Sequence, residues 1–354
     1  MTASIGGVRP ATANVAGIGV AHPPSISQDE LWQGYFSAHY AGVARGLAKR
    51  IFESSGVHTR HGVVNPLIED PSRWSTADRM HRYQLEALPL GHQALGTALQ
   101  RAGVAPHDLG LLVVCSCTGY ATPGLDILLA RDLAMAADLR RVFVGHMGCY
   151  AALPGLGVAA DYVALHARPA AMLCVELPSL HVQPSEADPQ QVVAHALFSD
   201  AAAAIVLVPG GAGPGVVRIV ARTDPQTADH MSWRVTDLGF RMGLSPRVPD
   251  ALARHVIPVV TELLATSDLA AHDVAAWAVH PGGPRILDVV RNRLDLADTA
   301  LVESTRVLAE HGNCSSSTVL LILDELLRRS GGLGGSAVAM AFGPGLTLYA
   351  ALLV

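Results

Sequence analysis

The sequence lacks a long hydrophobic run and has few aromatic residues. Phe, Trp and Tyr make up 5% of its 354 residues. No window reaches the roughly 18 uninterrupted apolar residues that a membrane-spanning helix needs. Residues 1–9 contain no basic segment followed by an apolar one, which is the pattern of a secretory signal. We therefore expect a cytoplasmic protein with no membrane span.

A strong positive charge is absent as well. The formal net charge is −5 and the calculated isoelectric point is near 6.3, which argues against nucleic acid or an anionic membrane as the main partner. Half of the residues are hydrophobic, so a disordered chain is excluded and a large core can form. The length suits one large domain or two medium ones.

The cysteines form neither a ligand pattern nor a disulfide pattern. There are five of them, an odd number, and none belongs to a Cys-x-x-Cys pair. Buried, reduced thiols in a cytosolic protein are the simplest interpretation for most of them. They are Cys115, Cys117, Cys149, Cys174 and Cys314. We predict no metal site.

Short apolar runs alternate with longer helical patterns, which is typical of an α/β protein with buried strands. In the first half we predict strands at residues 109–117, 141–147, 170–177 and 201–209, and helices at 91–101, 125–135 and 151–165. In the second half we predict strands at 216–222, 275–280, 337–342 and 346–354, and helices at 249–265, 284–294 and 315–329.

A glycine-rich break, Gly-Gly-Ala-Gly-Pro-Gly at residues 210–215, separates the two halves. We place the internal boundary there, which gives an N-terminal half of residues 1–209 and a C-terminal half of residues 210–354. Because both halves alternate strands with helices and no low-complexity linker joins them, we expect two similar α/β layers packed together.

Cys149 stands where a predicted strand ends, directly after Gly148 and before an Ala- and Gly-rich helix. A thiol at a helix N-terminus feels the positive end of the helix dipole, which lowers its pKa. The alternative is that Cys149 only fills the core, as a cysteine among alanines often does.

Two other polar residues stand at similar places. His280 ends a buried strand before a Pro-Gly-Gly turn, and Asn313 precedes three serines and an apolar helix. A solvated histidine and a helix cap are the plainer interpretations. Taken together, however, Cys149, His280 and Asn313 suit carbon–carbon bond formation on thioesters. A thiolate accepts an acyl group, an imidazole keeps the thiol ionised, and imidazole and carboxamide donors stabilise an oxyanion.

Longer strings point to a family. They are Ala-Leu-Phe-x-Asp-x-Ala-Ala-Ala at 196–204, Val-His-Pro-Gly-Gly-Pro-x-Ile-Leu-Asp at 279–288, His-Gly-Asn-x-Ser-Ser at 311–316 with Leu-Asp-Glu at 323–325, and Phe-Gly-Pro-Gly-Leu-Thr at 342–347. In these strings the chain resembles the chalcone and stilbene synthases, which are type III polyketide synthases. The resemblance begins at about Gly-Val-x-x-Arg-His, residues 56–61, and continues to the C-terminus.

The resemblance implies a thiolase fold, five-layered αβαβα, and a homodimer with one active site per subunit. It implies that Cys149 is the nucleophile, His280 the catalytic imidazole and Asn313 the carboxamide. Phe198 matches the first gatekeeper of the family. The second gatekeeper, usually aromatic, falls on Met242, which is a departure from the pattern.

Other expectations concern the cavity. The segment Met-Ser-Trp-Arg-Val-Thr-Asp-x-Gly-Phe at 231–240 looks like bacterial members that make alkylpyrones or alkylresorcinols. Trp233 stands where plant members keep a small residue, so their cavity shape cannot be transferred. His181 replaces a usual Thr or Cys, and serves either as an extra proton donor or only to fill volume. The other expected lining residues are Thr118, Thr122 and Ser315.

The implied substrates are acyl-CoA and malonyl-CoA, with no other cofactor. We expect repeated decarboxylative condensation onto a fatty acyl starter held on the cysteine, then cyclisation to an alkylpyrone or a resorcinol. Candidate CoA-binding residues are Lys49, Arg50, Gly282, Gly283 and Arg285.

Three alternatives stay open. A β-ketoacyl-ACP synthase of the initiating type shares the fold and the Cys, His and Asn, but usually carries Gln-Ala-Asn where this chain has Pro281-Gly282-Gly283. HMG-CoA synthase-like chemistry needs a further catalytic glutamate, for which Glu176 is the only candidate nearby. The third alternative is a catalytically silent binding subunit, which would not need Cys149, His280 and Asn313 together.

Overall fold

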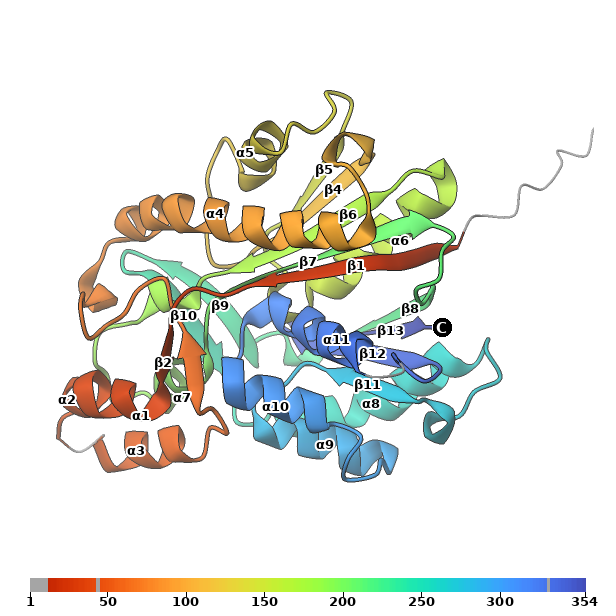
Figure 1. Cartoon of the computed structure of the whole chain (residues 1–354). Helices are drawn as coiled ribbons and strands as arrows, with labels where there is room; N and C mark the ends of the chain where they lie inside the picture. Colours follow the sequence, from red (N-terminus) through yellow and green to blue (C-terminus); the bar gives the residue numbers. More distant parts are fainter. Residues whose placement is uncertain (1–11, 43–44, 330–331) are drawn as a thin grey trace, which may run out of the picture.

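The computed structural model describes residues 12–42, 45–329 and 332–354. Two sheets form its centre (Figure 1). The first has the strand order β1 (Ala13–Ala21), β7 (Ala201–Pro209), β6 (Ala170–Glu176), β4 (Leu111–Cys115) and β5 (Arg140–Val144). The second has the order β11 (Ala276–Val279), β12 (Ala337–Gly343), β13 (Thr347–Leu353) and β8 (Val216–Thr223).

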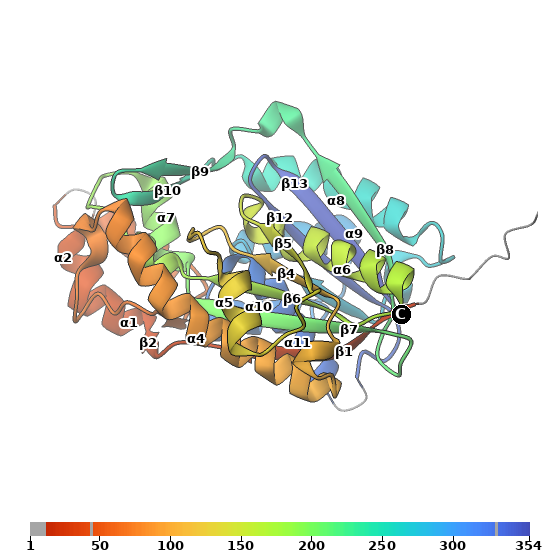
Figure 2. The same ribbon diagram turned by 90° about the horizontal axis from the view of Figure 1, so that it is seen from above.

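Helices lie outside and between these sheets, as the views in Figures 1 and 2 show. Helices α4 (Thr76–Ala102) and α5 (Leu125–Asp132) cover the outer face of the first sheet. Helices α6 (Ala152–His166) and α11 (Thr318–Arg328) fill the space between the sheets. Helices α8 (Val248–Leu264) and α9 (Pro284–Leu294) cover the outer face of the second sheet, and α10 (Val302–His311) packs beside α11. The five-layered αβαβα order expected from the sequence is thus confirmed.

Strand burial follows from this layering. Strands β4 and β6 are parallel, and every one of their residues is buried because helices cover both faces. Strand β5 differs, since it forms the edge of the first sheet and four of its five residues are exposed. The loop from Pro209 to Val216 connects the two sheets. The division into halves 1–209 and 210–354 stays a prediction.

The stretch Gly148–His166, which includes α6, is long enough and apolar enough to cross a membrane, with a mean hydropathy of 1.2. It is the one such stretch among the residues that the structure describes, and 56% of it is buried inside the molecule. Because α6 lies between two sheets, it must be apolar on more than one face, which gives a core helix this composition.

The remaining elements form an extension beside the two sheets, seen at the lower left of Figure 1. Its apolar cluster includes Trp32, Phe36, Phe52 and Val192. The elements are β2 (Ser25–Ser27), β3 (Thr59–His61), α1 (Gln28–Leu31), the π-helix Trp32–Phe36, α2 (Ser37–His39), α3 (Arg45–Glu53), α7 (Pro189–Leu197), β9 (Met231–Thr236) and β10 (Gly239–Leu244).

Most predicted elements are present, and three differences stand out. Helix α4 begins at Thr76 rather than at residue 91, with Ser75 and Asp78 forming a capping box at its start. Strand β1 was not predicted, although it pairs with β7 along its whole length. The hairpin of β9 and β10 was not predicted either, and it belongs to neither of the two large sheets.

Candidate active site

Cys149 lies in a single turn, Gly148–Tyr150, between β5 and α6. Gly148 has φ of +67°, and a Cβ at this position would lie 2.8 Å from Cδ of Pro344. Glycine is therefore required both for the backbone conformation and for close packing against the turn after β12. The thiol is buried, and the Ser315 hydroxyl lies 3.6 Å from its Sγ.

His280 directly follows β11 and is completely buried. Its backbone N–H donates to the Met340 carbonyl of β12 at 2.8 Å, which extends the sheet by one residue. The ring lies edge-on to Phe342, with 5.7 Å between the centroids. Neither ring nitrogen has a hydrogen-bond partner in the described part of the chain.

Asn313 follows α10 and Gly312 and pairs with the segment that carries Phe198. Its backbone N–H donates to the Leu197 carbonyl at 2.8 Å, and its carbonyl accepts from the Ser199 N–H at 3.0 Å. The Asn313 Oδ1 accepts from the Ser315 N–H at 2.9 Å. Because the oxygen end of the amide is held in this way, its NH₂ end is the one left to act as a donor.

The fold brings these three side chains to one place. Cys149, His280 and Asn313 all line a cavity of about 330 Å³, together with Phe198 and Met242. Each of the three stands where a strand or helix ends, and the elements come from both sheets. His280 and Asn313 lie 131 and 164 positions after Cys149 in the sequence. Local sequence alone could not have placed them around the cysteine.

Burial controls the charge of this group. It raises the pKa of the Cys149 thiol to about 12 and lowers the pKa of His280 to about 3. The sequence had led us to expect a lowered thiol pKa from a helix N-terminus, and the structure gives the opposite direction because desolvation dominates. Burial thus disfavours a charge on either side chain alone. A proton that leaves the Cys149 thiol must therefore pass directly to a partner such as His280.

A second cavity, of about 420 Å³, also reaches Cys149. Thr118, Ser315, Phe198, Trp233 and Met242, all expected from the sequence to line the cavity, are among its lining residues. The indole N–H of Trp233 donates to the Cys117 carbonyl at 2.7 Å, which fixes the ring in the wall.

Glu176, at the end of β6, was named from the sequence only as the glutamate that HMG-CoA synthase-like chemistry would need, and its hydrogen bonds here were not predicted. It is fully buried and accepts hydrogen bonds from the Thr118 hydroxyl at 2.8 Å and the Ser316 hydroxyl at 2.6 Å. It also accepts from the Cys117 backbone N–H at 3.0 Å. Burial raises its pKa. The signal in the sequence was a single charged residue at the end of an otherwise apolar strand.

A third cavity, of about 650 Å³, lies behind the second. Both are lined by Pro178, Phe198, Trp233 and Met242, which therefore form the wall between them. The residues expected as gatekeepers, Phe198 and Met242, thus lie where the 330, 420 and 650 Å³ cavities meet.

His181 lines only the 650 Å³ cavity of these three. Its Nδ1 accepts from the Phe240 N–H at 3.0 Å, so its Nε2 donates to the Thr118 carbonyl at 2.7 Å. Burial lowers its pKa to about 3. Because both nitrogens are engaged and the ring is neutral, the structure does not support a role as an extra proton donor. His181 joins the Thr118 segment to the hairpin instead.

Thr122 departs from expectation. It is exposed, it precedes a cis bond to Pro123, and it is not among the residues that line the cavities of the single chain. The chain turns outward at Gly119, which packs directly against the ring of Tyr83. That Thr122 lines the cavity stays a prediction, because the cavities of the single chain give it no support.

The expected CoA-binding residues divide into two groups. Gly282, Gly283 and Arg285 line an open, mostly apolar cavity of about 1280 Å³, and Gly282 also lines the cavity that holds Cys149. Lys49 and Arg50 are exposed on α3. Lys49 pairs with Glu53 at 3.6 Å and borders a different cavity, of about 970 Å³.

Comparison with known proteins settles the family. The chain matches the description "Chalcone and stilbene synthases, N-terminal domain" over residues 7–214 and the corresponding C-terminal domain over residues 217–354. The chain belongs to the chalcone and stilbene synthase family.

Two relatives of the chain come from bacteria. The chain is 37% identical over 312 residues to 1,3,6,8-tetrahydroxynaphthalene synthase of Streptomyces peucetius, covering 86% of this chain and 82% of the relative. It is 34% identical over 316 residues to the alpha-pyrone synthesis polyketide synthase-like Pks18 of Mycobacterium tuberculosis, covering 84% and 80%.

A solved member of the family has the same architecture. The crystal structure of 1,3,6,8-tetrahydroxynaphthalene synthase from Streptomyces coelicolor superposes with a TM-score of 0.91 at 29% identity, covering 96% of this chain and 99% of that one. The chain is therefore a type III polyketide synthase with the thiolase fold, an enzyme of the acyltransferase class.

Proposed function

We propose that this chalcone and stilbene synthase family member holds an acyl starter on Cys149 and extends it with malonyl-CoA. The observation that supports this most directly is one cavity lined by a buried thiol, an imidazole and an amide, where neither imidazole nitrogen nor the NH₂ end of the amide has a partner among the residues that the structure describes. These groups supply a nucleophile, a proton acceptor and oxyanion donors.

In the first step the Cys149 sulfur attacks the thioester carbonyl of acyl-CoA. The thiol proton passes to His280 as the new C–S bond forms, and it then leaves with the CoA thiolate. Moving the proton within this pair avoids a lone buried charge on either group, since burial disfavours both the thiolate and the imidazolium.

In the second step malonyl-CoA loses CO₂, and the remaining enolate carries negative charge on its oxygen. A ring N–H of His280 and the NH₂ group of Asn313 donate to this oxygen, and each such donor typically contributes about 3–4 kcal/mol at the transition state. The enolate carbon attacks the acyl-cysteine and the C–S bond breaks. The Cys149 thiolate can then take back the lengthened chain from CoA.

The polarity of the cavities supports a proposal for the starter. The residues around the second and third cavities are largely apolar, including Phe198, Trp233 and Met242, which favours a fatty acyl starter. Cyclisation of the extended chain would release an alkylpyrone or a resorcinol. The name of the relative Pks18 refers to alpha-pyrone synthesis, which supports the pyrone.

CoA would enter through the 1280 Å³ cavity, where Gly282 and Gly283 allow the pantetheine arm to approach the backbone. The candidate cations for the CoA phosphates are Arg285, at the rim of this cavity, and Lys49 and Arg50 on α3. We propose that the enzyme needs no cofactor besides these thioesters. A cytoplasmic location agrees with five free cysteines, all of which lie in the described part of the chain.

We also propose a homodimer. Strand β5 ends the first sheet with an unpaired edge, and it exposes Val142 and Phe143 at 38% and 42%. An exposed apolar edge strand is a surface that normally pairs with another chain or is covered. A second copy of this chain would pair with this edge and continue the sheet.

The nucleophile is tested by incubating purified protein with labelled acyl-CoA. Wild type should carry one acyl group on the peptide that contains Cys149, and Cys149→Ala should carry none. Cys117→Ala, which removes the other thiol of the 420 Å³ cavity, is the matched control and should still be acylated. An adduct of wild-type yield on Cys149→Ala would refute the proposal. Asn313→Ala should retain acylation but lose malonyl-CoA decarboxylation.

A further inference from the structure

The hairpin of β9 and β10 forms a wall between two of the cavities. It belongs to neither large sheet, and an isolated two-stranded hairpin is only marginally stable by itself. Trp233 on β9 lies opposite Met242 on β10 in the register. These two residues, with Phe198 and Pro178, separate the 420 Å³ cavity from the 650 Å³ cavity. The position of the hairpin therefore decides how far the two spaces are joined.

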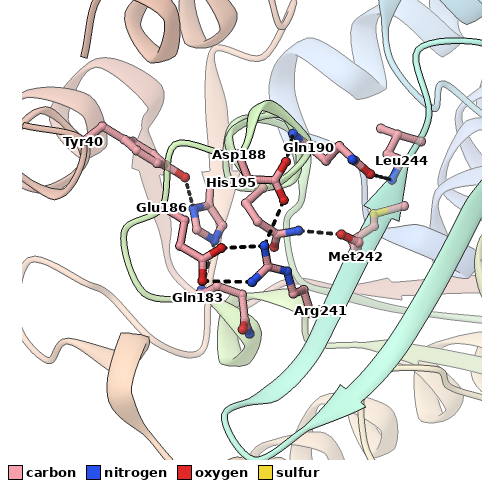
Figure 3. A network of polar contacts seen from close by, with 10 residues as sticks. Tyr40, Gln183, Glu186, Asp188, Gln190, His195, Arg241, Met242 and Leu244 are labelled. Atoms are coloured by element: carbon pink, nitrogen blue, oxygen red, sulfur yellow. Dashed lines mark hydrogen bonds and ion pairs between the residues drawn. The ribbon is translucent and has the colours of Figure 1, made fainter. Parts of the chain in front are cut away.

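One charged group ties this hairpin to the rest of the molecule. The guanidinium of Arg241 contacts both carboxylate oxygens of Glu186, at 3.0 and 2.6 Å, and Oδ2 of Asp188 at 2.9 Å (Figure 3). In the described structure no other residue of 231–244 forms an ion pair. The Arg241 and Asp188 side chains are 23% and 26% exposed and Glu186 is 45% exposed, so water screens the contact with Asp188 less than the contact with Glu186.

The acceptors belong to the segment that carries the other gatekeeper. Asp188 caps the N-terminus of α7, and Phe198 is the residue at which that helix ends. The ion pair therefore links one end of α7 to β10, while Phe198 at the other end faces Trp233 with 6.4 Å between ring centroids. Arg241 thus bridges the two sides of the wall.

Two glutamines hold the part of the strand that directly follows Arg241. The Gln191 amide donates to the Met242 carbonyl at 2.5 Å, and the Leu244 N–H donates to the Gln190 side chain at 2.6 Å (Figure 3). Residues 241 to 244 are thus fastened to the first turn of α7. Methionine is flexible and has no fixed shape of its own, so the place of the Met242 side chain depends on how firmly its backbone is held.

We propose that Arg241 is a positioning residue that keeps Met242 and Trp233 against Phe198 and so limits the length of the acyl starter. The inference rests on the proposed use of acyl-CoA starters. Without the ion pair the hairpin moves more freely, the two cavities join for more of the time, and longer chains gain room that shorter chains do not need.

The test compares kcat/KM for hexanoyl-CoA and palmitoyl-CoA, each with malonyl-CoA. For Arg241→Gln we expect the palmitoyl-to-hexanoyl ratio to rise by about fivefold or more. Arg241→Lys keeps the charge but not the two-pronged contact, and should give a smaller rise. The matched control is Arg234→Gln, because Arg234 is the exposed register partner of Arg241 on β9. Its ratio should equal that of wild type.

Malonyl-CoA decarboxylation without a starter serves as a second readout, which we expect to be unchanged in Arg241→Gln. An unchanged ratio in a folded Arg241→Gln overturns the proposal, as does an equal rise in Arg234→Gln. Should Arg241→Gln fail to fold, Glu186→Gln removes the pair from the other side and is judged by the same ratio. A wild type that forms no polyketide from any acyl-CoA would instead refute the proposed function.

Discussion

The Cys149 thiol and the His280 imidazole become charged only together, by transfer of a proton from one to the other. Burial raises the pKa of one to about 12 and lowers the pKa of the other to about 3. Removing the imidazole leaves the thiol without its proton acceptor. We therefore expect His280→Ala to lower the rate constant for alkylation of Cys149 by iodoacetamide, near neutral pH, by at least about tenfold.

His146→Ala is the control for this measurement. His146 lines the neighbouring cavity beside Cys149 but is exposed, so its loss should leave the alkylation rate close to that of wild type. Equal losses in the two variants would show that His280 has no special relation to the thiol.

At the level of residues, the sequence predicted the groups that stand where an apolar element ends. Cys149 and Asn313 each directly follow a glycine, and His280 stands just before a Pro-Gly-Gly turn, so that pattern is visible locally. The roles of Glu176 and His181 were not predictable in this way. Glu176 receives hydrogen bonds from Thr118 and Ser316, which lie 58 and 140 positions away. Only the fold decides that these groups meet.

The turn that presents Cys149 is an element whose conformation depends on one glycine. Gly148 has φ of +67° and lies against Pro344. We expect Gly148→Ala to lower the free energy of unfolding by about 1–3 kcal/mol, because a Cβ strains this backbone conformation and also meets the proline ring. Acylation of Cys149 should fall more steeply than stability, since the turn carries the nucleophile. Urea denaturation and the acylation assay measure the two effects.

Gly96→Ala provides the contrasting result. Gly96 lies within α4, and a Cβ there would meet no atom within 4 Å. The substitution should stabilise the protein by about 0.5–1 kcal/mol, because alanine favours the helix. If Gly148→Ala proved as harmless as Gly96→Ala, the strain argument would be wrong.

Strands with a strong apolar pattern were predicted from the sequence. A strand whose residues are determined by packing against a neighbouring helix was not. The buried runs of β4, β6 and β7 are apolar enough to identify as strands. Strand β1 contains Gly17 and Gly19, which weaken a strand signal. The structure explains both, since a Cβ at either position would lie within 2.4 Å of a carbonyl oxygen of α4. The requirement comes from the helix that crosses the strand.

For the whole molecule, buried neutral histidines make stability depend on pH. His181 and His280 are fully buried, with pKa values lowered from 6.5 to about 3. The unfolded chain therefore binds protons first as the pH falls, and stability is lost between about pH 6.5 and pH 3. Between pH 6.5 and 5 each group costs up to about 2 kcal/mol. Burial of Asp200 raises its pKa to about 7, which offsets part of this loss.

Urea denaturation at several pH values measures this slope. His181→Gln removes one of these buried groups and should give a shallower loss of stability at acid pH. His272→Gln is the control, because the His272 side chain is 85% exposed and should leave the slope unchanged. A stability that does not fall between about pH 6.5 and pH 5 would contradict the assignment of neutral buried imidazoles.

The last property of the whole molecule is the proposed association of two chains through strand β5. Four of the five residues of strand β5 are exposed, so Val142 and Phe143 contact water in the single chain. Burying them against the same strand of a second copy would pair the open edge and remove apolar surface from water. We expect Phe143→Glu to place two like charges in that contact and to convert dimer into monomer, as judged by light scattering after gel filtration. Val235→Glu changes an equally apolar residue that is 71% exposed on β9 and should leave the mass unchanged, whereas a wild type that elutes as a monomer would remove the dimer from the proposal.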